Sequence, residues 1–426
     1  MGHGESDPHV LDESLRRDYV PSGRCRAIRL ARAQLRCCHR GRRQLLGFPV
    51  QRNGAPFGRR AALAGLLVSA RESNDKQRGL TRRLLGWYRR EARDLPWRRT
   101  RDPYTVWAAE IILQQTRIEQ GTPYFERFMA AFPTVEALAE ADGDAVLKVW
   151  EGLGYYGRAR RMQEAAKEIV HARHGRFPSS AEDWRRLPGV GRYTAGAIAS
   201  IALGERTPVL DGNVKRVLAR VFRIEACIDD AATTERLWAV ASDLVPASHP
   251  GDFNQALMEL GARVCTPQRP QCSDCPIRLL CEAYASGHQL ELPVRRARGQ
   301  TPHREMVAAV IRRNGRYLIA KRPSHGLLAG LWEFPSGEVR AGESHEAALR
   351  RIAQGDLGVD VCVGGLVAVA EQAYSHFHAT LTAYRCACPA GRPAPVSHVA
   401  SKWVRRSELE RFAFPRINQK ILAHLL

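Results

Sequence analysis

The chain has 426 residues, more than one hydrophobic core usually supports, so its length predicts two or three domains. Apolar residues make up 44% of it, which excludes a largely disordered chain. The net charge of +21 favours a polyanionic partner, with nucleic acid ahead of an anionic membrane surface. The longest apolar stretch, 61–70, is far shorter than the roughly 20 residues of a membrane span, so we expect no membrane segment and a cytoplasmic protein.

The first segment, residues 1–78, differs in composition from the rest. It carries twelve arginines and no acidic residue between Arg24 and Arg71, with little sustained periodicity. We interpret it as a basic, poorly ordered arm. Loose DNA binding and an overextended N-terminus are both open interpretations.

Hydrophobic periodicity divides the remainder of the chain into two parts. Apolar positions recur at helical spacing from Leu80 onward, the basic stretch 294–304 predicts a linker, and strand-like alternation follows it. We therefore predict an all-helical domain over 79–293 and a smaller α/β domain over 305–426. The predicted helices are Val106–Leu113, Ala137–Trp150, Ala195–Leu203, Val214–Phe222 and Ser344–Gln354, and the predicted strands are Met306–Ile311, Tyr317–Ala320, Val361–Ala370 and Leu381–Cys386.

Two acidic residues stand in unusual places. Glu110 lies among apolar helix positions, where burial disfavours the charged form and raises the pKa, as a general acid requires. Asp211 lies where a loop leads into the next helix, and capping that helix is its structural alternative. One protonated and one ionised carboxylate are typical of sites that cleave a glycosidic bond.

Two glycine-containing segments are candidates for DNA contact. The segment Gly152–Arg160 combines glycines with two tyrosines and two arginines, which suits either insertion into a base stack or a plain structural turn. The segment Leu187–Gly191 precedes an Ala-rich helix, and Gly189 and Gly191 permit a tight hairpin whose amides bind phosphate. We interpret the second segment as a helix-hairpin-helix DNA contact.

The cysteines predict a metal centre. Eleven cysteines in a chain of this length, without an export signal, disfavour a disulfide framework. The spacing C-x6-C-x2-C-x5-C fits one compact cluster, either tetrahedral zinc or iron–sulfur, and its single C-x2-C pair favours [4Fe–4S]. The four ligands are Cys265, Cys272, Cys275 and Cys281.

Taken together, these motifs resemble the helix-hairpin-helix DNA glycosylase superfamily and, within it, adenine DNA glycosylases of MutY type. The resemblance covers roughly residues 80–420 and keeps the family's motif order. It rests on Leu95–Arg98, Glu110–Thr116, Gly152–Tyr156, Leu187–Thr194, Leu210–Val214, Phe253–Gln255 and the four cysteines.

The resemblance implies a role for each matched residue. Glu110 is similar to the acid that protonates adenine N7, and Asp211 to the carboxylate that stabilises the sugar cation, with Asn213 and Tyr193 ordering the site. Arg98 and Gln255 resemble contacts to the flipped adenine, although Gln255 alone suits a capping role. Residues similar to those that fill the vacated stack and touch the opposite base are Gln115, Thr116, Leu153 and Tyr155. For Thr116 and Leu153, plain helix or packing roles stay open.

The resemblance also implies the reaction. The expected substrate is double-stranded DNA with adenine opposite 8-oxoguanine or guanine, the cofactor a [4Fe–4S] cluster, and the protein a monomer acting at the bacterial nucleoid. Endonuclease III, the sister family, has a catalytic lysine where this chain has Tyr193, and without an amine nucleophile there is no easy Schiff base. We therefore expect a monofunctional glycosylase; the rivals are an endonuclease III-like lyase and a non-catalytic mismatch binder.

The C-terminal part resembles a Nudix fold from Trp332–Gly337 onward. An active Nudix site needs several glutamates on one helix to hold magnesium, but this helix offers Arg350–Asp356, which disfavours a nucleotide pyrophosphatase. We expect the domain to read the lesion strand through Tyr374, Ser375 and His376, where the family usually has Phe-Ser-His. The tyrosine keeps the ring and adds a hydroxyl.

Overall fold

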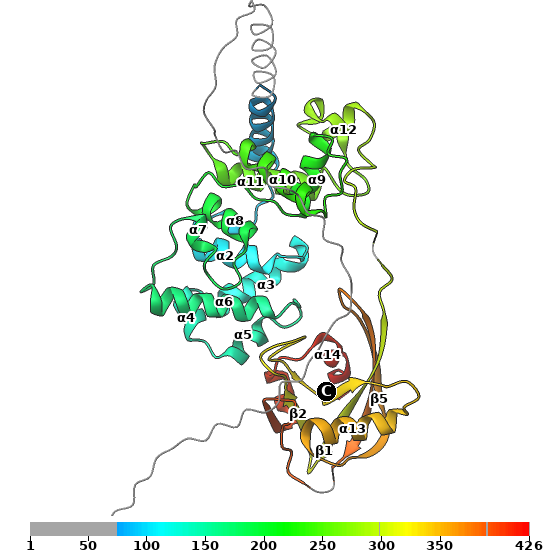
Figure 1. Ribbon diagram of the computed structural model, residues 1–426. Coiled ribbons are helices and arrows are strands. Elements are labelled where there is room, and N and C mark those ends of the chain that lie inside the picture. Colours follow the sequence, from blue (N-terminus) through cyan, green and yellow to red (C-terminus); the bar gives the residue numbers. More distant parts are fainter. Residues whose placement is uncertain (1–74, 298, 389–390, 426) are drawn as a thin grey trace, which may run out of the picture. The chain divides into compact units, whose positions relative to one another are not determined.

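The computed structural model describes residues 75–297, 299–388 and 391–425 (Figure 1). The arm predicted over 1–78 therefore lies almost wholly outside the described residues. Within them, no helix is both long and apolar enough to cross a membrane.

The described residues up to 297 contain helices and turns without a strand. Residues 75–91 are helical. The elements that follow are η1 (Pro96–Arg98), α2 (Pro103–Ile112), α3 (Ile118–Ala131), α4 (Val135–Glu140), α5 (Gly143–Val149), α6 (Gly157–Lys167), η2 (Glu168–Ala172), α7 (Ala181–Trp184), α8 (Arg192–Ala202), α9 (Gly212–Val221), α10 (Ala231–Leu244), α11 (Pro250–Arg263), η3 (Cys272–Asp274), η4 (Arg278–Leu280) and α12 (Glu282–Ala285).

Short polar side chains set several helix boundaries. Asp102 accepts a hydrogen bond from the amide of Thr105 and begins α2. Asp142 accepts from the amides of Asp144 and Ala145 and begins α5. The single helix predicted over Ala137–Trp150 is therefore two helices, because an aspartate in extended conformation offers the backbone a cap instead of a continuous turn.

The helical part has two hydrophobic cores. Helices α2 to α7 pack around one core, which includes Trp107, Phe128 and Trp150. Helices α9, α10 and α11 pack with residues 75–91 around the other. Helix α8 contributes to both cores, with Ile198 in the first and Ala197 in the second. Residues that project from the surfaces between these cores are thus positioned by rigid packing on both sides.

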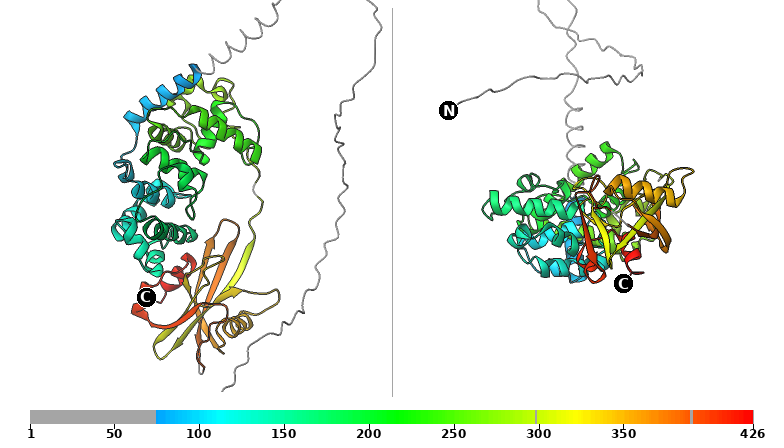
Figure 2. Two further views of the ribbon diagram at one scale, coloured as in Figure 1. Left: turned by 60° about the vertical axis from the view of Figure 1, so that its left-hand side comes forward. Right: turned by 90° about the horizontal axis from the view of Figure 1, so that it is seen from below.

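The C-terminal part is a mixed sheet with a helix on each face (Figure 2). The strands run in the order β3-β2-β1-β6-β5, with β4 paired to β1 and β7 paired to β2; β1 and β6 are parallel. The elements are β1 (His303–Arg313), β2 (Arg316–Lys321), β3 (Trp332–Glu333), β4 (Ser336–Glu338), α13 (His345–Leu357), β5 (Cys362–Ala373), β6 (His378–Ala387), β7 (Ala400–Arg405), η5 (Arg406–Arg411) and α14 (Arg416–Leu422).

Alternation along β1 separates the two faces of this sheet. Val307 and Ile311 pack in the core that contains α13, whereas Ala308 and Val310 pack in the core that contains α14. Because successive side chains of a strand point to opposite faces, one continuous apolar run can serve both cores. The predicted helical and α/β parts are confirmed, while the boundaries chosen for them stay predictions.

Candidate active site

A cavity of about 810 Å³ lies between residues of the two helical cores. Val106 and Trp97 from the first core and Met258, which packs against the second, line it. The structure brings eight of the predicted site residues into this cavity: Arg98, Glu110, Gln115, Thr116, Tyr193, Asp211, Asn213 and Gln255. Residues separated by more than a hundred positions therefore face one space.

Glu110 projects from α2 into the cavity and meets Tyr193 of α8. The Tyr193 hydroxyl donates a hydrogen bond of 2.6 Å to Oε2 of Glu110 and also lies 3.2 Å from the sulfur of Met258. Burial raises the pKa of Glu110 to about 7, against the opposing effect of the Tyr193 hydrogen bond. Burial also raises the pKa of Tyr193 well above its ordinary value, so the phenol stays protonated and can donate. Near neutral pH, Glu110 can therefore hold or release a proton.

Asp211 lies at the start of α9, and both of its carboxylate oxygens accept hydrogen bonds. Oδ1 accepts from the amide of Val214 at 2.7 Å, and Oδ2 accepts from the side chain of Asn213 at 2.9 Å. The residue is thus the N-cap of α9 as well as a cavity residue. Burial raises the pKa of Asp211 above its ordinary value, although these hydrogen bonds and the charge of Arg216 act in the opposite direction. The ionised form of Asp211 is the one that all of these contacts support.

Asn213 is fixed in turn by the buried Arg216. The guanidinium donates to Oδ1 of Asn213 at 2.9 Å and to the carbonyls of Gly261 and Cys265, each at 2.7 Å. A Cβ on Gly261 would come within 2.6 Å of the Asn213 side chain, so only glycine allows α9 and α11 to approach this closely. The orientation of the amide toward Asp211 is therefore dictated by helix packing.

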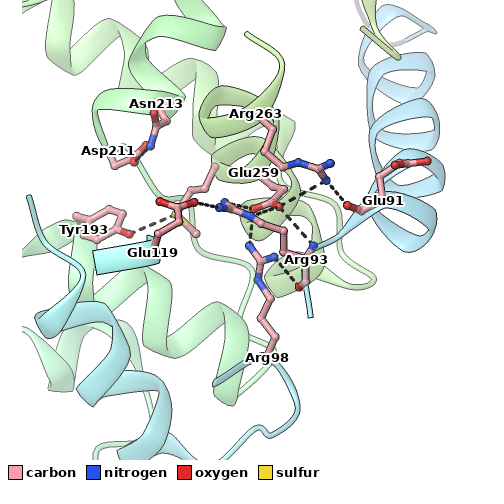
Figure 3. Close-up of polar contacts among 10 residues, drawn as sticks. Glu91, Arg93, Arg98, Glu119, Tyr193, Asp211, Asn213, Glu259 and Arg263 are labelled. Carbon is pink, nitrogen blue, oxygen red and sulfur yellow. Dashed lines mark hydrogen bonds and ion pairs between the residues drawn. The ribbon is translucent and has the colours of Figure 1, made fainter. Parts of the chain in front are cut away.

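A further acid of the cavity, Glu259 of α11, was not among the predicted site residues. Its side chain is 1% exposed and lines the cavity one helical turn after Gln255. Arg93 donates two hydrogen bonds of 2.8 Å to it, and Arg98 donates one of 2.9 Å (Figure 3). Burial raises the pKa of Glu259, but the two guanidinium groups outweigh burial and lower it to about 2. The signal that identified Glu110, an acid within an apolar helix, also marks Glu259 in the sequence.

The predicted DNA contacts outside the cavity occupy tight turns. Gly189 has a φ of +76°, and a Cβ there would come within 2.7 Å of the Arg161 side chain, so the hairpin requires glycine at this position. Gly191 is the N-cap of α8. Tyr155 is 50% exposed on the turn before α6, whereas Leu153 packs against the first core.

Tyr374, Ser375 and His376 form the turn between β5 and β6. The amide of Tyr374 donates to the carbonyl of Phe377 at 2.8 Å, and the two rings stack at 4.6 Å. Ser375 and His376 are exposed, and the hydroxyls of Ser375 and Tyr155 are hydrogen-bonded to each other. Tyr374 is half-buried, so the tip of this turn presents a hydroxyl and an imidazole.

The four predicted cysteine ligands line one small apolar cavity together with Ile277 and Tyr284. No three His, Cys, Asp or Glu side chains among the described residues converge closely enough to hold a single metal ion. The wholly buried Arg220 donates to the sulfur of Cys265 at 3.2 Å, which suits an anionic thiolate.

Comparison with known proteins extends over both parts of the chain. The HhH-GPD superfamily of base excision DNA repair proteins matches residues 108–242, and the NUDIX domain matches residues 306–424. The adenine DNA glycosylase of Rattus norvegicus is 37% identical over 394 residues, which cover 80% of this chain and 76% of the rat protein. The chain belongs to the adenine DNA glycosylase family.

Further members of the family align over similar spans. The human adenine DNA glycosylase is 37% identical over 79% of this chain and 72% of its own length. The Arabidopsis thaliana protein is 40% identical over 68% of this chain and 52% of its own length. As an adenine DNA glycosylase, the chain is a base excision repair enzyme that hydrolyses N-glycosyl bonds. The predicted family, fold and reaction class are confirmed.

Proposed function

We propose that this adenine DNA glycosylase removes adenine opposite 8-oxoguanine or guanine, with Glu110 as the general acid and Asp211 as the stabilising carboxylate. The observation that carries the proposal is that these two acids line one cavity, where the surroundings of Glu110 favour its protonated form and the contacts of Asp211 favour its ionised form. Glu110 has a pKa near 7 and a phenol partner, whereas Asp211 accepts hydrogen bonds that favour its ionised form. Such a pair suits departure of a base through an oxocarbenium-like state.

In this mechanism, the protonated carboxyl of Glu110 gives its proton to N7 of the adenine. The base can then leave as a neutral group while positive charge develops on the deoxyribose. The carboxylate of Asp211, oriented by Asn213, faces that charge, and water completes the hydrolysis at the sugar carbon. Gln255 and Arg98 contact the base, and the Arg98 guanidinium is held for this by Glu259.

The cavity favours hydrolysis over lyase chemistry. No lysine is among the residues that line it in the described part of the chain. Lys215, on α9, directs its ammonium to the carbonyl of Ile228 and the hydroxyl of Thr234 instead. Without a nearby amine to form a Schiff base, the strand stays intact after the base departs.

The four cysteines are the proposed ligands of a [4Fe–4S] cluster. The cluster would supply a covalent link between the α11 end at Cys265 and the turns that carry Cys272, Cys275 and Cys281. Arg220 and Arg216 already join that region to α9 through Cys265. Iron and sulfide analysis of anaerobically purified protein tests this, and stoichiometric zinc without iron would contradict it.

We assign recognition of the opposite base to the β5–β6 turn, together with Tyr155, Gln115 and Thr116. The Tyr155–Ser375 hydrogen bond supports this, because it joins a candidate stacking residue to a candidate reader of the oxidised base edge. Ser375 can both donate and accept. Replacing Ser375 and His376 together by alanine should narrow the preference for 8-oxoguanine over guanine by roughly 1–3 kcal/mol. The exposed pair Ser407 and His424, changed likewise, is the control, and an unchanged preference would contradict the assignment.

A single-turnover assay tests the proposed reaction. Duplexes carry adenine opposite 8-oxoguanine, guanine or cytosine, and each reaction is analysed with and without alkali. We expect release opposite 8-oxoguanine, slower release opposite guanine, none opposite cytosine, and strand breaks only after alkali. Borohydride trapping of a covalent adduct would support the lyase alternative, and binding without base release would support the mismatch-binder alternative.

A further inference from the structure

Residues 292–296, around Pro293, are held by several contacts with the helical domain. Arg220 donates to the carbonyl of Leu292 at 2.8 Å, and the amide of Ile228 donates to the carbonyl of Val294 at 3.0 Å. Arg296 is anchored on its other side, with its guanidinium 2.7 Å from Asp230. Three of these residues, at positions 292, 294 and 296, therefore have defined partners.

Arg295, between these anchored residues, has none. Its side chain is exposed, and no hydrogen bond or ion pair involves it among the described residues. It nevertheless lines the same cavity as Asp211, Gly212 and Asn213. Its positive charge also repels that of the nearby Arg216. The fold thus holds a cation at the cavity wall next to another cation and without a carboxylate partner.

The chemistry of the proposed reaction places an anion at this wall. If Asp211 stabilises the sugar cation, the deoxyribose lies beside Asp211, and its two flanking phosphates are joined to the sugar ring through O3′ on one side and through C5′ and O5′ on the other. Flipping the nucleotide turns those phosphates toward the protein. Helix α9 begins at Gly212, so the positive end of its dipole points to the same place.

We propose that Arg295 binds a backbone phosphate of the flipped adenine nucleotide and so holds the sugar against Asp211. The proposal rests on the function proposed above. Arg295 is a positioning residue, because it acts on the sugar through the phosphate and takes no proton. The ligand class is a DNA phosphodiester of the nucleotide in the cavity.

The test compares Arg295→Ala and Arg295→Lys with Arg406→Ala, which removes the same charge from an exposed site in η5. The probe is a duplex with a tetrahydrofuran abasic analogue opposite 8-oxoguanine, and the control probe is the same duplex undamaged. Dissociation constants are measured over a range of KCl concentrations. One lost phosphate contact should lower the slope of log K against log salt by about 0.9.

For Arg295→Ala, we expect that lower slope and about tenfold weaker binding to the abasic probe, as loss of one charge-assisted contact implies. The lysine variant should keep the slope, and binding of the undamaged duplex should stay unchanged. An Arg295→Ala protein that matches Arg406→Ala on both probes would overturn the proposal. So would equal weakening on both probes, which would place the contact outside the flipped nucleotide.

A third outcome separates this proposal from electrostatic tuning of the acids. A shifted pH profile of adenine release with an unchanged salt slope would mean that Arg295 acts on Asp211 or Glu110, and the phosphate assignment would be wrong. Adenine release by the unaltered chain is measured in the same series. If release occurs but Arg295→Ala has no effect on slope or affinity, the proposed function stands and the phosphate site alone fails.

Discussion

Glu110 lies on α2 and Glu259 on α11, each among apolar residues, and both side chains line the same cavity. Their pKa values nevertheless differ widely. The pKa of Glu110 is raised to about 7, whereas that of Glu259 is lowered to about 2. Burial acts in the same direction on both carboxyls. The difference therefore reflects the groups that the fold brings to each carboxyl as well as the extent to which each is desolvated.

Those groups come from distant parts of the chain. Glu110 receives a neutral phenol from Tyr193, 83 residues away, and Glu259 receives two guanidinium groups from Arg93 and Arg98, more than 160 residues away. A phenol hydrogen bond offsets only part of the desolvation of a carboxylate, but two nearby cations exceed it. A buried acid in a helix thus becomes a proton donor or a fixed anion according to its partners, and one cavity contains both.

The largest expected effect comes from removing the donor. Glu110→Gln keeps the size and polarity of the side chain but cannot supply a proton, so adenine release should fall by at least roughly 10²-fold. Duplex affinity should stay nearly unchanged. Single-turnover release and equilibrium binding measure the two, with the exposed Glu126→Gln on α3 as control. Release at the original rate would sink the acid assignment.

Glu259→Gln tests the other side of the comparison. It leaves Arg98 without its anion and Arg93 with only the exposed Glu119, and breaking such a partly buried cluster costs roughly 3 kcal/mol of unfolding free energy. The exposed pair Asp94–Arg99 provides the control, since Asp94→Asn should cost less than about 1 kcal/mol. Urea unfolding of both variants measures the difference. Equal stability of the two would show that Glu259 is not a structural anion.

The fold was largely predictable where periodicity is strong. The run Val106–Leu113 corresponds to α2, and Met306–Ile311 lies within β1, because each buries a continuous apolar set. The short strands β3 and β4 have two and three residues, too few to show an alternation. The break within Ala137–Trp150 depends on the hydrogen bonds by which Asp142 caps α5. Such a cap is a local contact that the hydrophobic pattern does not reveal.

The site was predictable as a set of residues but not as a network. The motifs indicated Glu110, Asp211 and Tyr193, and the structure places all three in one cavity. The contacts of Glu259 with Arg93 and Arg98 join segments more than 160 residues apart, and no local pattern encodes that pairing. The anchoring of the segment around Arg295 likewise depends on long-range contacts with Ile228 and Asp230.

The pH dependence of adenine release sharpens the comparison, because only one of the two acids titrates near neutrality. Glu110 is the donor when protonated, and that form is lost as the pH rises through about 7. The rate should therefore fall about tenfold for each pH unit above about 7, and it should also fall at acid pH, where the Asp211 carboxylate takes up a proton. Glu259 stays ionised throughout that range, so it adds no sloping limb to the pH–rate profile. A profile that stays flat to pH 9, with duplex affinity measured at each pH, would contradict the raised pKa of Glu110.

The smallest effect concerns the phenol that distinguishes Glu110 from Glu259. The Tyr193 hydroxyl donates to the carboxylate of Glu110, and this contact lowers the pKa that burial raises. Tyr193→Phe removes the donor, so the pKa of Glu110 should rise further, by about one unit for a hydrogen bond to a charged group. The falling limb of the pH–rate profile should then move to higher pH, while the rate at low pH changes little.

Tyr104→Phe is the matched control for this last variant, since Tyr104 lies on the same helix as Glu110 and donates to the carbonyl of Phe132 at 2.8 Å. That substitution should leave the limb in place. A limb that moves to lower pH in Tyr193→Phe would mean that the phenol stabilises the protonated carboxyl. In that case Tyr193 would help to retain the proton on Glu110. The phenol would then raise the pKa of its carboxyl, whereas the guanidinium partners of Glu259 lower theirs.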